Sequence, residues 1–449
     1  MNAERTALFS DAPVRKAVLT LAIPTVISQL ITVVYNMADT FFIGKLNDPL
    51  QVAAATIVMP CFMLLTGFAN LFGLGGSSLI SRCLGSDNQD RARHCASFCI
   101  WTGAAVALLY GIAVVLLEPL LFPILGASAD TWEYCRQYAF WTIGIGAVPT
   151  VMNAELAHLI RAEGYSKPAG FGVAFGGILN IILDPIFIFV FRLNIEGAAI
   201  ATMLSNLIAM GYFLGFLYHI RRNSVITPNP KAFSVGERIP AEVLSVGLPG
   251  FVMTMMSTIS NAALNHMVAG YSDTAIAGMG IAKKIDLLAY AIAQGMTQGT
   301  LPLIGYNYTS GNHKRMKAAI KTAFAYSFLV ACVGAVLLWT LAAPISRCFI
   351  ADTETVRYGQ HFLKIICLAC PTTAVNFMVI TVFQAIGKKV QPLCLSLLRK
   401  GSLDVVFMLI LNSAVGVSGI AWATPFADWI AFVISVALIV PQLKQLGSK

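Results

Sequence analysis

Two polar side chains and a proline interrupt an otherwise apolar stretch, residues 177–190, which reads GILNIILDPIFIFV. Asn180 and Asp184 are four residues apart, so on a helix they share one face. Pro185 lacks a backbone donor and frees a carbonyl one turn back, near that face. A carboxylate in hydrocarbon is costly unless it is paired, protonated or bound to an ion. This stretch is therefore a candidate functional site.

Two other segments supply polar groups that we expect at the same depth. Asn36 and Asp39 lie near the end of the first apolar segment, and Thr202 lies about two turns into the sixth. Two neighbouring carboxylates cannot both stay ionised at low cost, so the set suits one shared proton or a hard monovalent cation. The alternative interpretation is a hydrogen-bonded network that only packs helices together. A possible Na⁺ site would use Asp39, Asn180, Asp184 and Thr202.

The composition places these residues in a membrane protein. The chain has 449 residues, of which 57% are hydrophobic and 11% charged, whereas soluble proteins carry about 25% charged residues. We expect an all-α integral membrane protein that is not an enzyme. The sequence contains no phosphate-binding G-x-x-x-x-G-K-[ST] loop and no HExxH motif, and it predicts no cofactor beyond a coupling Na⁺ or H⁺.

The net charge of +9 has two interpretations. It could indicate nucleic acid or anionic partners, but Lys and Arg also collect in the cytoplasmic loops of membrane proteins. We favour the second and predict no nucleic-acid partner. The ten cysteines include a CxxC pair, Cys367 and Cys370, within an apolar segment, where buried small side chains are expected rather than a metal or redox site.

The apolar segments predict about twelve transmembrane helices. Basic residues gather in alternate connections, which predicts that both termini are cytoplasmic. The expected helices are residues 17–43, 51–81, 93–117, 134–159, 168–191, 195–220, 240–269, 275–305, 317–341, 356–385, 390–412 and 418–441.

The two halves of the chain resemble each other at a shift of about 220–225 residues, which indicates an internal duplication. LAIP at 21–24 matches VGLP at 246–249, and GAAIAT at 197–202 matches GIAWAT at 419–424. We therefore predict two pseudo-symmetric six-helix lobes, residues 1–221 and 239–449, joined by a cytoplasmic linker, residues 222–238. Asp39 then corresponds to Leu264, Asn180 to Asp404 and Asp184 to Met408, so the polar cluster belongs to the first half.

Further polar residues inside predicted helices are candidates for a substrate cavity. Pairing within the membrane is the alternative for the charged ones, and we expect Asp404 to pair with Arg399 or Lys400. The candidates are Asn153, Lys284, Arg399, Asp404 and Asp428.

The sequence resembles the multidrug and toxic compound extrusion (MATE) family, in particular its MepA-like branch. The resemblance runs along essentially the whole chain and rests on motifs whose order and spacing are specific. They are YNMADTFFIG, LGGSSLISRCLG, RAEGYSKP, NIILDPIFIF, GAAIAT, QGTLPLIGYNYTSGN, SLLRKG and TPFAD.

This resemblance implies a two-lobe exporter that exchanges drug-like, mostly cationic, organic compounds for Na⁺ or H⁺. It also implies that Asp39, Asn180, Asp184 and Thr202 form the coupling site, with Asn36 one turn from Asp39. We further expect a multi-pass protein of the plasma membrane that works as a monomer in the lipid bilayer. The alternative function is a flippase for lipid-linked precursors, whose anionic substrate would need a strongly basic central cavity.

Overall fold

The structure, a computed structural model, describes residues 3–350 and 352–445, and every regular element in this part of the chain is a helix. Nine of the described helices are long and apolar enough to cross a membrane, and a bent pair adds a tenth span. Two further long segments, α10 and α15–η5–α16, carry charged residues within their length, and with them the spans number the predicted twelve. The all-α membrane fold is confirmed.

The first six spans form the amino-terminal lobe. In order they are α2 (Val14–Gly44), α3 (Pro49–Gly85), α4 (Gln89–Ile124), α5–η1–α6 (Trp132–Ala139, Phe140–Ile145, Ala147–Ala162), α7–η2 (Ser166–Pro185, Ile186–Val190) and α8 (Asn194–Ile220). A short helix, α1 (Ala3–Ser10), precedes them, and the connection to the second lobe contains one 3₁₀ turn, η3 (Pro230–Ala232).

The last six spans form the carboxy-terminal lobe. They are α9 (Ile239–Ala269), α10 (Asp273–Thr309), α11 (His313–Thr340), α13–η4–α14 (Thr353–Ile366, Cys367–Ala369, Cys370–Ala385), α15–η5–α16 (Val390–Ser396, Leu397–Leu403, Asp404–Val415) and α17 (Val417–Gln445), with the short α12 (Ala342–Phe349) after α11. The predicted lobe limits at residues 1 and 449 lie outside the described residues, and the division at 221 and 239 stays a prediction.

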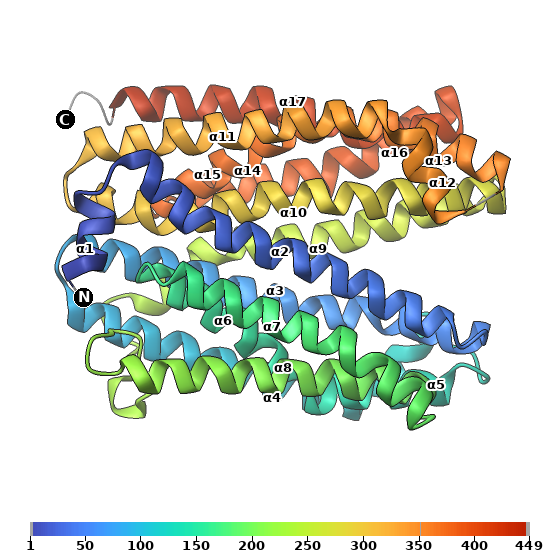
Figure 1. Ribbon diagram of the computed structural model, residues 1–449, viewed down its shortest axis with the longest axis horizontal. Helices are drawn as coiled ribbons and strands as arrows, with labels where there is room; N and C mark the ends of the chain where they lie inside the picture. Colours follow the sequence, from blue (N-terminus) through green and yellow to red (C-terminus); the bar gives the residue numbers. More distant parts are fainter. Residues whose placement is uncertain (1–2, 351, 446–449) are drawn as a thin grey trace.

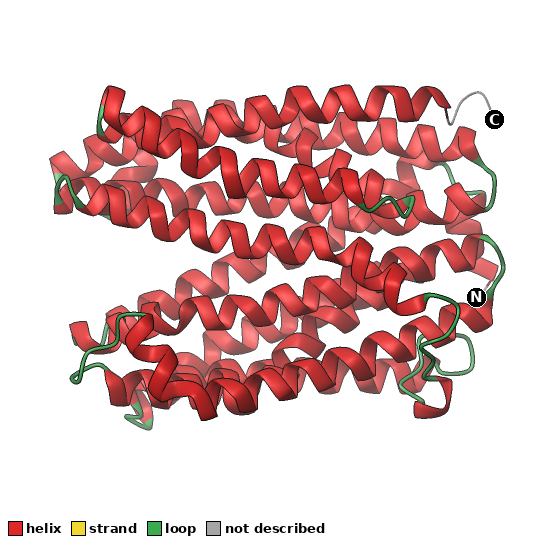
Figure 2. Cartoon of the chain, turned by 180° about the vertical axis from the view of Figure 1, so that it is seen from behind, coloured by secondary structure: helices red, strands yellow, loops and turns green. Residues whose placement is uncertain are grey.

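The two groups of helices lie side by side, and both chain ends are at the same end of the bundle (Figure 1). We call this the terminal end and the opposite one the far end. The first helix of each lobe crosses to its neighbour, so that α2 packs on α10 and α9 packs on α3. Toward the far end the ribbons of the two groups diverge (Figure 2).

Glycines allow these crossing helices to approach backbone to backbone. A Cβ at Gly247 of α9 would overlap the carbonyl oxygen of Leu71 on α3, and one at Gly75 would overlap that of Val243. At the second crossing, a Cβ at Gly299 of α10 would lie 2.6 Å from the Cα of Ala22. The lobes are therefore in direct main-chain contact in the half of the molecule nearer the terminal end.

Ion pairs and hydrogen bonds add to this contact at the terminal end. Glu242 at the start of α9 accepts a hydrogen bond from Arg91 at 2.7 Å and lies 3.1 Å from Arg82. Ser78 donates to the carbonyl of Gln384 at 2.6 Å, again from one lobe to the other. We refer to these contacts as the inner seam.

Helix α1 docks on the opposite lobe. Phe9 is fully buried and stacks on Tyr306 of α10, with ring centroids 5.1 Å apart. Its carbonyl accepts hydrogen bonds from Arg315 at 2.6 Å and Asn307 at 3.1 Å. The segment that precedes the first span thus also holds the lobes together.

Several spans predicted as single helices are broken. The span over 134–159 bends by 48° at Gly146, and glycine there weakens helix continuity. Pro185 is followed by the π-helical turn η2, and the span over 390–412 contains the π-helical turn η5 around Gly401. Such turns are common at functional sites, and both lie beside buried polar residues.

Candidate functional site

The predicted polar cluster of the amino-terminal lobe forms where α7 and α8 meet. Asn180 Nδ2 donates to Asp184 Oδ1 at 3.2 Å, one turn along α7, and to Thr202 Oγ1 on α8 at 3.4 Å. Asn180, Asp184 and Thr202 are 1%, 0% and 6% exposed. The structure therefore brings these three residues together, deep inside the lobe.

Asp39 reaches the same region from α2. Asp39 and Asp184 lie near enough to interact electrostatically, and the hydroxyls of Tyr35 and Tyr138 interact with both. Helix α2 can approach α7 because Gly177 leaves room for the Tyr35 ring, which a Cβ there would contact at 2.9 Å. A glycine thus sets the distance between the two helices that carry the carboxylates.

Three buried oxygens of this cluster have no hydrogen-bond partner among the described residues. They are Asp39 Oδ1, Asn180 Oδ1 and Asp184 Oδ2. Leaving such groups unsatisfied in the interior costs about 1–3 kcal/mol each, and more for a charged group. Neither carboxylate has a basic partner within the described chain. The donor set of carboxylate, amide and hydroxyl oxygens therefore fits a proton or a small hard cation such as Na⁺.

The remaining predicted members lie further away. Asn36 is exposed on α2, and no hydrogen bond joins its side chain to the cluster among the described residues. Asn153 of α6 donates to Asn206 at 2.8 Å, and Asn206 in turn donates to the Thr202 carbonyl at 3.0 Å. Asn153 thus continues the polar network toward the terminal end, and its proposed role in substrate binding stays a prediction.

A small cavity lies between the lobes. Its lining comes from α3, α9, α10 and α14 and contains no charged residue. The polar groups that face it are amides and hydroxyls, namely Asn70, Thr254, Tyr290, Gln294, Thr297, Gln298, Thr381 and Gln384. Lys284, Arg399, Asp404 and Asp428 are not among the lining residues, and their part in substrate binding also stays a prediction.

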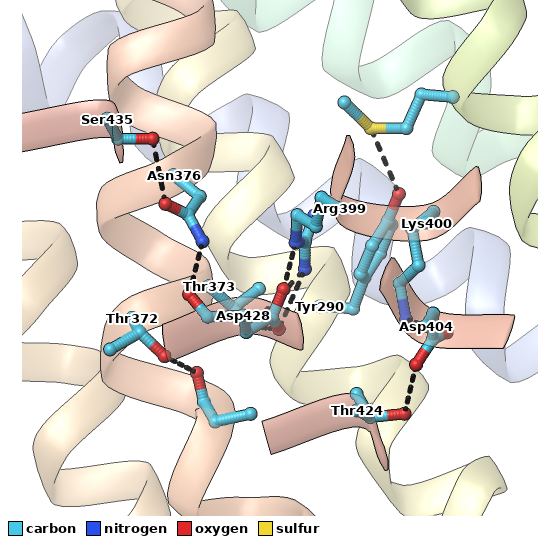
Figure 3. Close-up of polar contacts among 12 residues, drawn as sticks. Tyr290, Thr372, Thr373, Asn376, Arg399, Lys400, Asp404, Thr424, Asp428 and Ser435 are labelled. Carbon is cyan, nitrogen blue, oxygen red and sulfur yellow. Dashed lines mark hydrogen bonds and ion pairs between the residues drawn. The ribbon is translucent and has the colours of Figure 1, made fainter. Parts of the chain in front are cut away.

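The charged residues of the carboxy-terminal lobe pair with each other. Arg399 contacts Asp428 through its Nε and Nη2 atoms, and Asp428 also accepts a hydrogen bond from Thr373 (Figure 3). Lys400 Nζ lies 3.6 Å from Asp404 Oδ2. The expected pairing with Asp404 is therefore made by Lys400, whereas Arg399 turns to α17.

The two lysines of α10 differ. Lys283 donates to Thr424 Oγ1 at 3.3 Å, so it belongs to the same charged group. Lys284, one residue on, is exposed. Three of the four basic residues that could have formed a basic central cavity thus contact acidic or polar side chains inside the carboxy-terminal lobe. They are Lys283, Arg399 and Lys400.

Sequence reasoning missed Tyr35, Tyr138 and Ser260. Tyr35 belongs to the quoted YNMAD motif, so its position beside Asp39 was a usable signal. Ser260 of α9 donates to Asp404 Oδ2 at 2.5 Å, across 144 positions of sequence, and nothing local indicates this contact. The ion pairs of Glu242 with Arg82 and Arg91 are equally non-local.

The fold defines a multi-pass helical membrane protein with a polar cluster buried inside one lobe. The family model MatE matches residues 24–186 and 249–410, two stretches that start about 225 residues apart. The chain belongs to this family, the multidrug and toxic compound extrusion (MATE) transporters, and is therefore a transporter rather than an enzyme.

Relatives and solved structures agree with this membership. The chain is 28% identical to the multidrug export protein MepA of Staphylococcus aureus strain MSSA476 over 439 residues, which cover 98% of this chain and 96% of that protein. A multidrug resistance MATE family transporter in an outward-facing conformation superposes with a TM-score of 0.91 at 24% identity, and both chains are fully covered. A MATE protein in complex with MaL6 gives the same three values. These structures confirm the two-lobe fold.

Proposed function

We propose that this protein is a secondary multidrug exporter that exchanges drug-like compounds for Na⁺ or H⁺ by alternating access. The observation that carries the proposal is the set of three buried oxygens on Asp39, Asn180 and Asp184, which have neither a hydrogen-bond partner nor a neutralising basic side chain among the residues that the structure describes. An exchangeable cation supplies the missing charge and contacts. The names of relatives as multidrug export proteins support the substrate class.

The structure supports a state that is closed at the terminal end. The inner seam and the α2–α10 and α3–α9 crossings lie there, and the helices diverge toward the far end. We infer that the terminal end faces the cytoplasm of a plasma-membrane exporter, so this is the outward-facing state. Substrate leaves the interlobe cavity toward the far end as the cation enters the cluster.

Coupling follows from differential binding of the cation to the two states. With the cation bound, Asp39 and Asp184 can approach each other, and α2 packs closely on α7. Without it, their mutual repulsion favours a different position of α2, which is also the helix that contacts α10 of the other lobe. A change in the cluster therefore acts on the interface between lobes through one continuous helix.

The free energy from one exchanged cation depends on the charge of the substrate. A tenfold cation gradient contributes about 1.4 kcal/mol, and a membrane potential of 100 mV adds about 2.3 kcal/mol. Together they sustain a gradient of about 500-fold for an uncharged substrate. Exchange for a monovalent cationic substrate moves no net charge, so the same cation then sustains only about a tenfold gradient.

The decisive experiment is efflux of fluorescent dyes from proteoliposomes under an imposed Na⁺ gradient or an imposed pH gradient. We expect one of the two gradients to drive efflux in the wild type and neither to do so in Asp39→Asn. The alternative, a flippase for lipid-linked anionic precursors, is disfavoured by the uncharged lining of the interlobe cavity. If folded wild-type protein showed no dye efflux under either gradient, the flippase would become the favoured function.

A further inference from the structure

The carboxy-terminal lobe contains a structural copy of part of the ion site. The internal repeat pairs Asn180 with Asp404 and Thr202 with Thr424. In the first lobe, Asn180 on α7 bonds Thr202 on α8 at 3.4 Å. In the second, Thr424 on α17 donates to Asp404 on α16 at 3.1 Å (Figure 3). The same two positions on the same two helices of each lobe are therefore in contact.

The two copies differ in how their oxygens are satisfied. In the first lobe an oxygen of Asn180 and one of Asp184 lack partners. In the second, Asp404 Oδ1 accepts from Thr424, while Oδ2 accepts from Ser260 at 2.5 Å and has the Lys400 ammonium 3.6 Å away. Both oxygens of the Asp404 carboxylate thus already have partners from the chain, and its charge is balanced by Lys400.

We propose that the Asp404 carboxylate, which is held in place by Ser260 and Thr424, is a monovalent-cation site whose permanent occupant is the ammonium group of Lys400. The proposal rests on the proposed role of the first lobe in cation exchange and extends it to the second. Because this ammonium is covalently attached, it can neutralise Asp404 but cannot cross the membrane. Exchangeable cations are then confined to the amino-terminal lobe.

Adjacent basic residues of η5 serve two different carboxylates because consecutive residues of a helix point in different directions. Lys400 lies four residues before Asp404, so it reaches the carboxylate one turn along its own span. Arg399 points away from it, to Asp428 of α17, and its guanidinium carbon lies 4.7 Å from the ring centre of Phe377. Arg399 is thus held by its own partners and leaves Asp404 to Lys400.

Truncation of Lys400 to alanine creates the space for a replacement cation. Lys400 lines a small pocket together with Thr424, Asp286 and Tyr290, among others. Removal of its side chain extends this pocket toward Asp404. A small primary ammonium ion or Na⁺ can then occupy the position that the lysine left.

The test is a thermal-shift titration of purified protein in an Asp39→Asn/Asp184→Asn background, which removes both carboxylates of the first lobe. With Lys400→Ala added, we expect n-propylammonium or Na⁺ to raise Tm saturably by at least about 2 °C, whereas 1-propanol has no effect. The background protein with Lys400 intact should not respond. Further addition of Asp404→Asn should abolish the response, because the carboxylate that holds the cation is gone.

Lys283 could move onto Asp404 when Lys400 is lost, so Lys283→Met/Lys400→Ala is tested in parallel. Lys400→Gln, which keeps most of the side-chain volume, replaces the alanine variant if the latter does not fold. Absence of a cation-specific shift in all folded variants overturns the proposal, as does an equal shift after Asp404→Asn. Failure of the proposed function is distinguishable, because dye efflux by the wild type tests it and does not enter this comparison.

Discussion

Glu242 of α9 and Arg91 of α4 form a hydrogen-bonded ion pair of 2.7 Å between segments 151 positions apart. It joins the carboxy-terminal lobe to the amino-terminal lobe at the terminal end. In the proposed transport cycle this contact must break so that substrate can be loaded from that end. The pair is only partly buried, so it is strong enough to bias the equilibrium without locking it.

We predict that Glu242→Gln shifts the protein toward the state open at the terminal end. Loss of a partly exposed pair is worth about 1 kcal/mol, which changes the ratio of the two states about fivefold. Double electron–electron resonance would measure the distance between spin labels attached to cysteines introduced at the exposed Ser86 and Ser310. The exposed Cys348 and Cys394 would first be replaced.

The matched control for this variant is Arg136→Gln. Arg136 pairs with Glu133 at 2.9 Å within one lobe, so its loss should leave the label distances unchanged. Distances that respond to Arg136→Gln as they do to Glu242→Gln would show that the seam has no special part in closure.

Asp184→Asn should reduce ion-driven dye efflux at least about tenfold while the protein remains folded, since the amide keeps the shape of the carboxylate but cannot hold a cation's charge. Size-exclusion profile and Tm would establish folding. Leu264→Met is the control, because Leu264 occupies the position that matches Asp39 and lies buried in an apolar cluster. If Leu264→Met lost its ion dependence, the assignment of coupling to the amino-terminal lobe would be wrong.

Arg399→Met should destabilise the protein by about 3–5 kcal/mol, because it leaves Asp428 buried without its counter-ion. The double variant Arg399→Met/Asp428→Leu should recover most of this loss, since neither charge then remains buried. Tm measurements in detergent test both. A double variant no more stable than the single one would mean that packing around Arg399, rather than charge, dominates.

Gln294→Glu should change substrate preference. Gln294 lines the uncharged interlobe cavity, so a carboxylate there gives a cationic substrate its first counter-ion. We expect the KM for a cationic dye to fall about fivefold or more, equivalent to about 1 kcal/mol, while that for a neutral dye stays constant. Gln294→Met separates charge from shape, and an equal effect of both substitutions would remove this cavity from the substrate path.

Much of the architecture could be predicted because membrane insertion imposes strong local rules. The lengths of the apolar segments predicted the transmembrane spans, and the repeat at about 220–225 residues predicted two similar lobes. The contact of Asn180 with Asp184 and Thr202 followed from helix periodicity and from depth. These inferences use only spacing along the chain.

Contacts between distant segments were beyond such reasoning. Arg399 and Lys400 could both have paired with Asp404 by spacing, and only the path of α17 decides that Arg399 contacts Asp428. Ser260 reaches Asp404 because α9 packs on η5. The π-helical turns were likewise not predicted, because they result from tertiary packing around Pro185 and Gly401 rather than from hydrophobic periodicity.

The glycine crossing of α3 and α9 acts as a fulcrum. Where Gly247 meets Leu71, no side chains lie between the helices to slide, so the lobes can tilt there more easily than they can separate. Helix α3 has 37 residues, and this point lies about three-fifths of the way from Pro49. The arm toward the far end is therefore about 33 Å long and the other about 21 Å. In the proposed cycle, a rotation about this crossing moves the far end about one and a half times as far as the terminal end, so the opening that releases compounds becomes wider than the one that admits them.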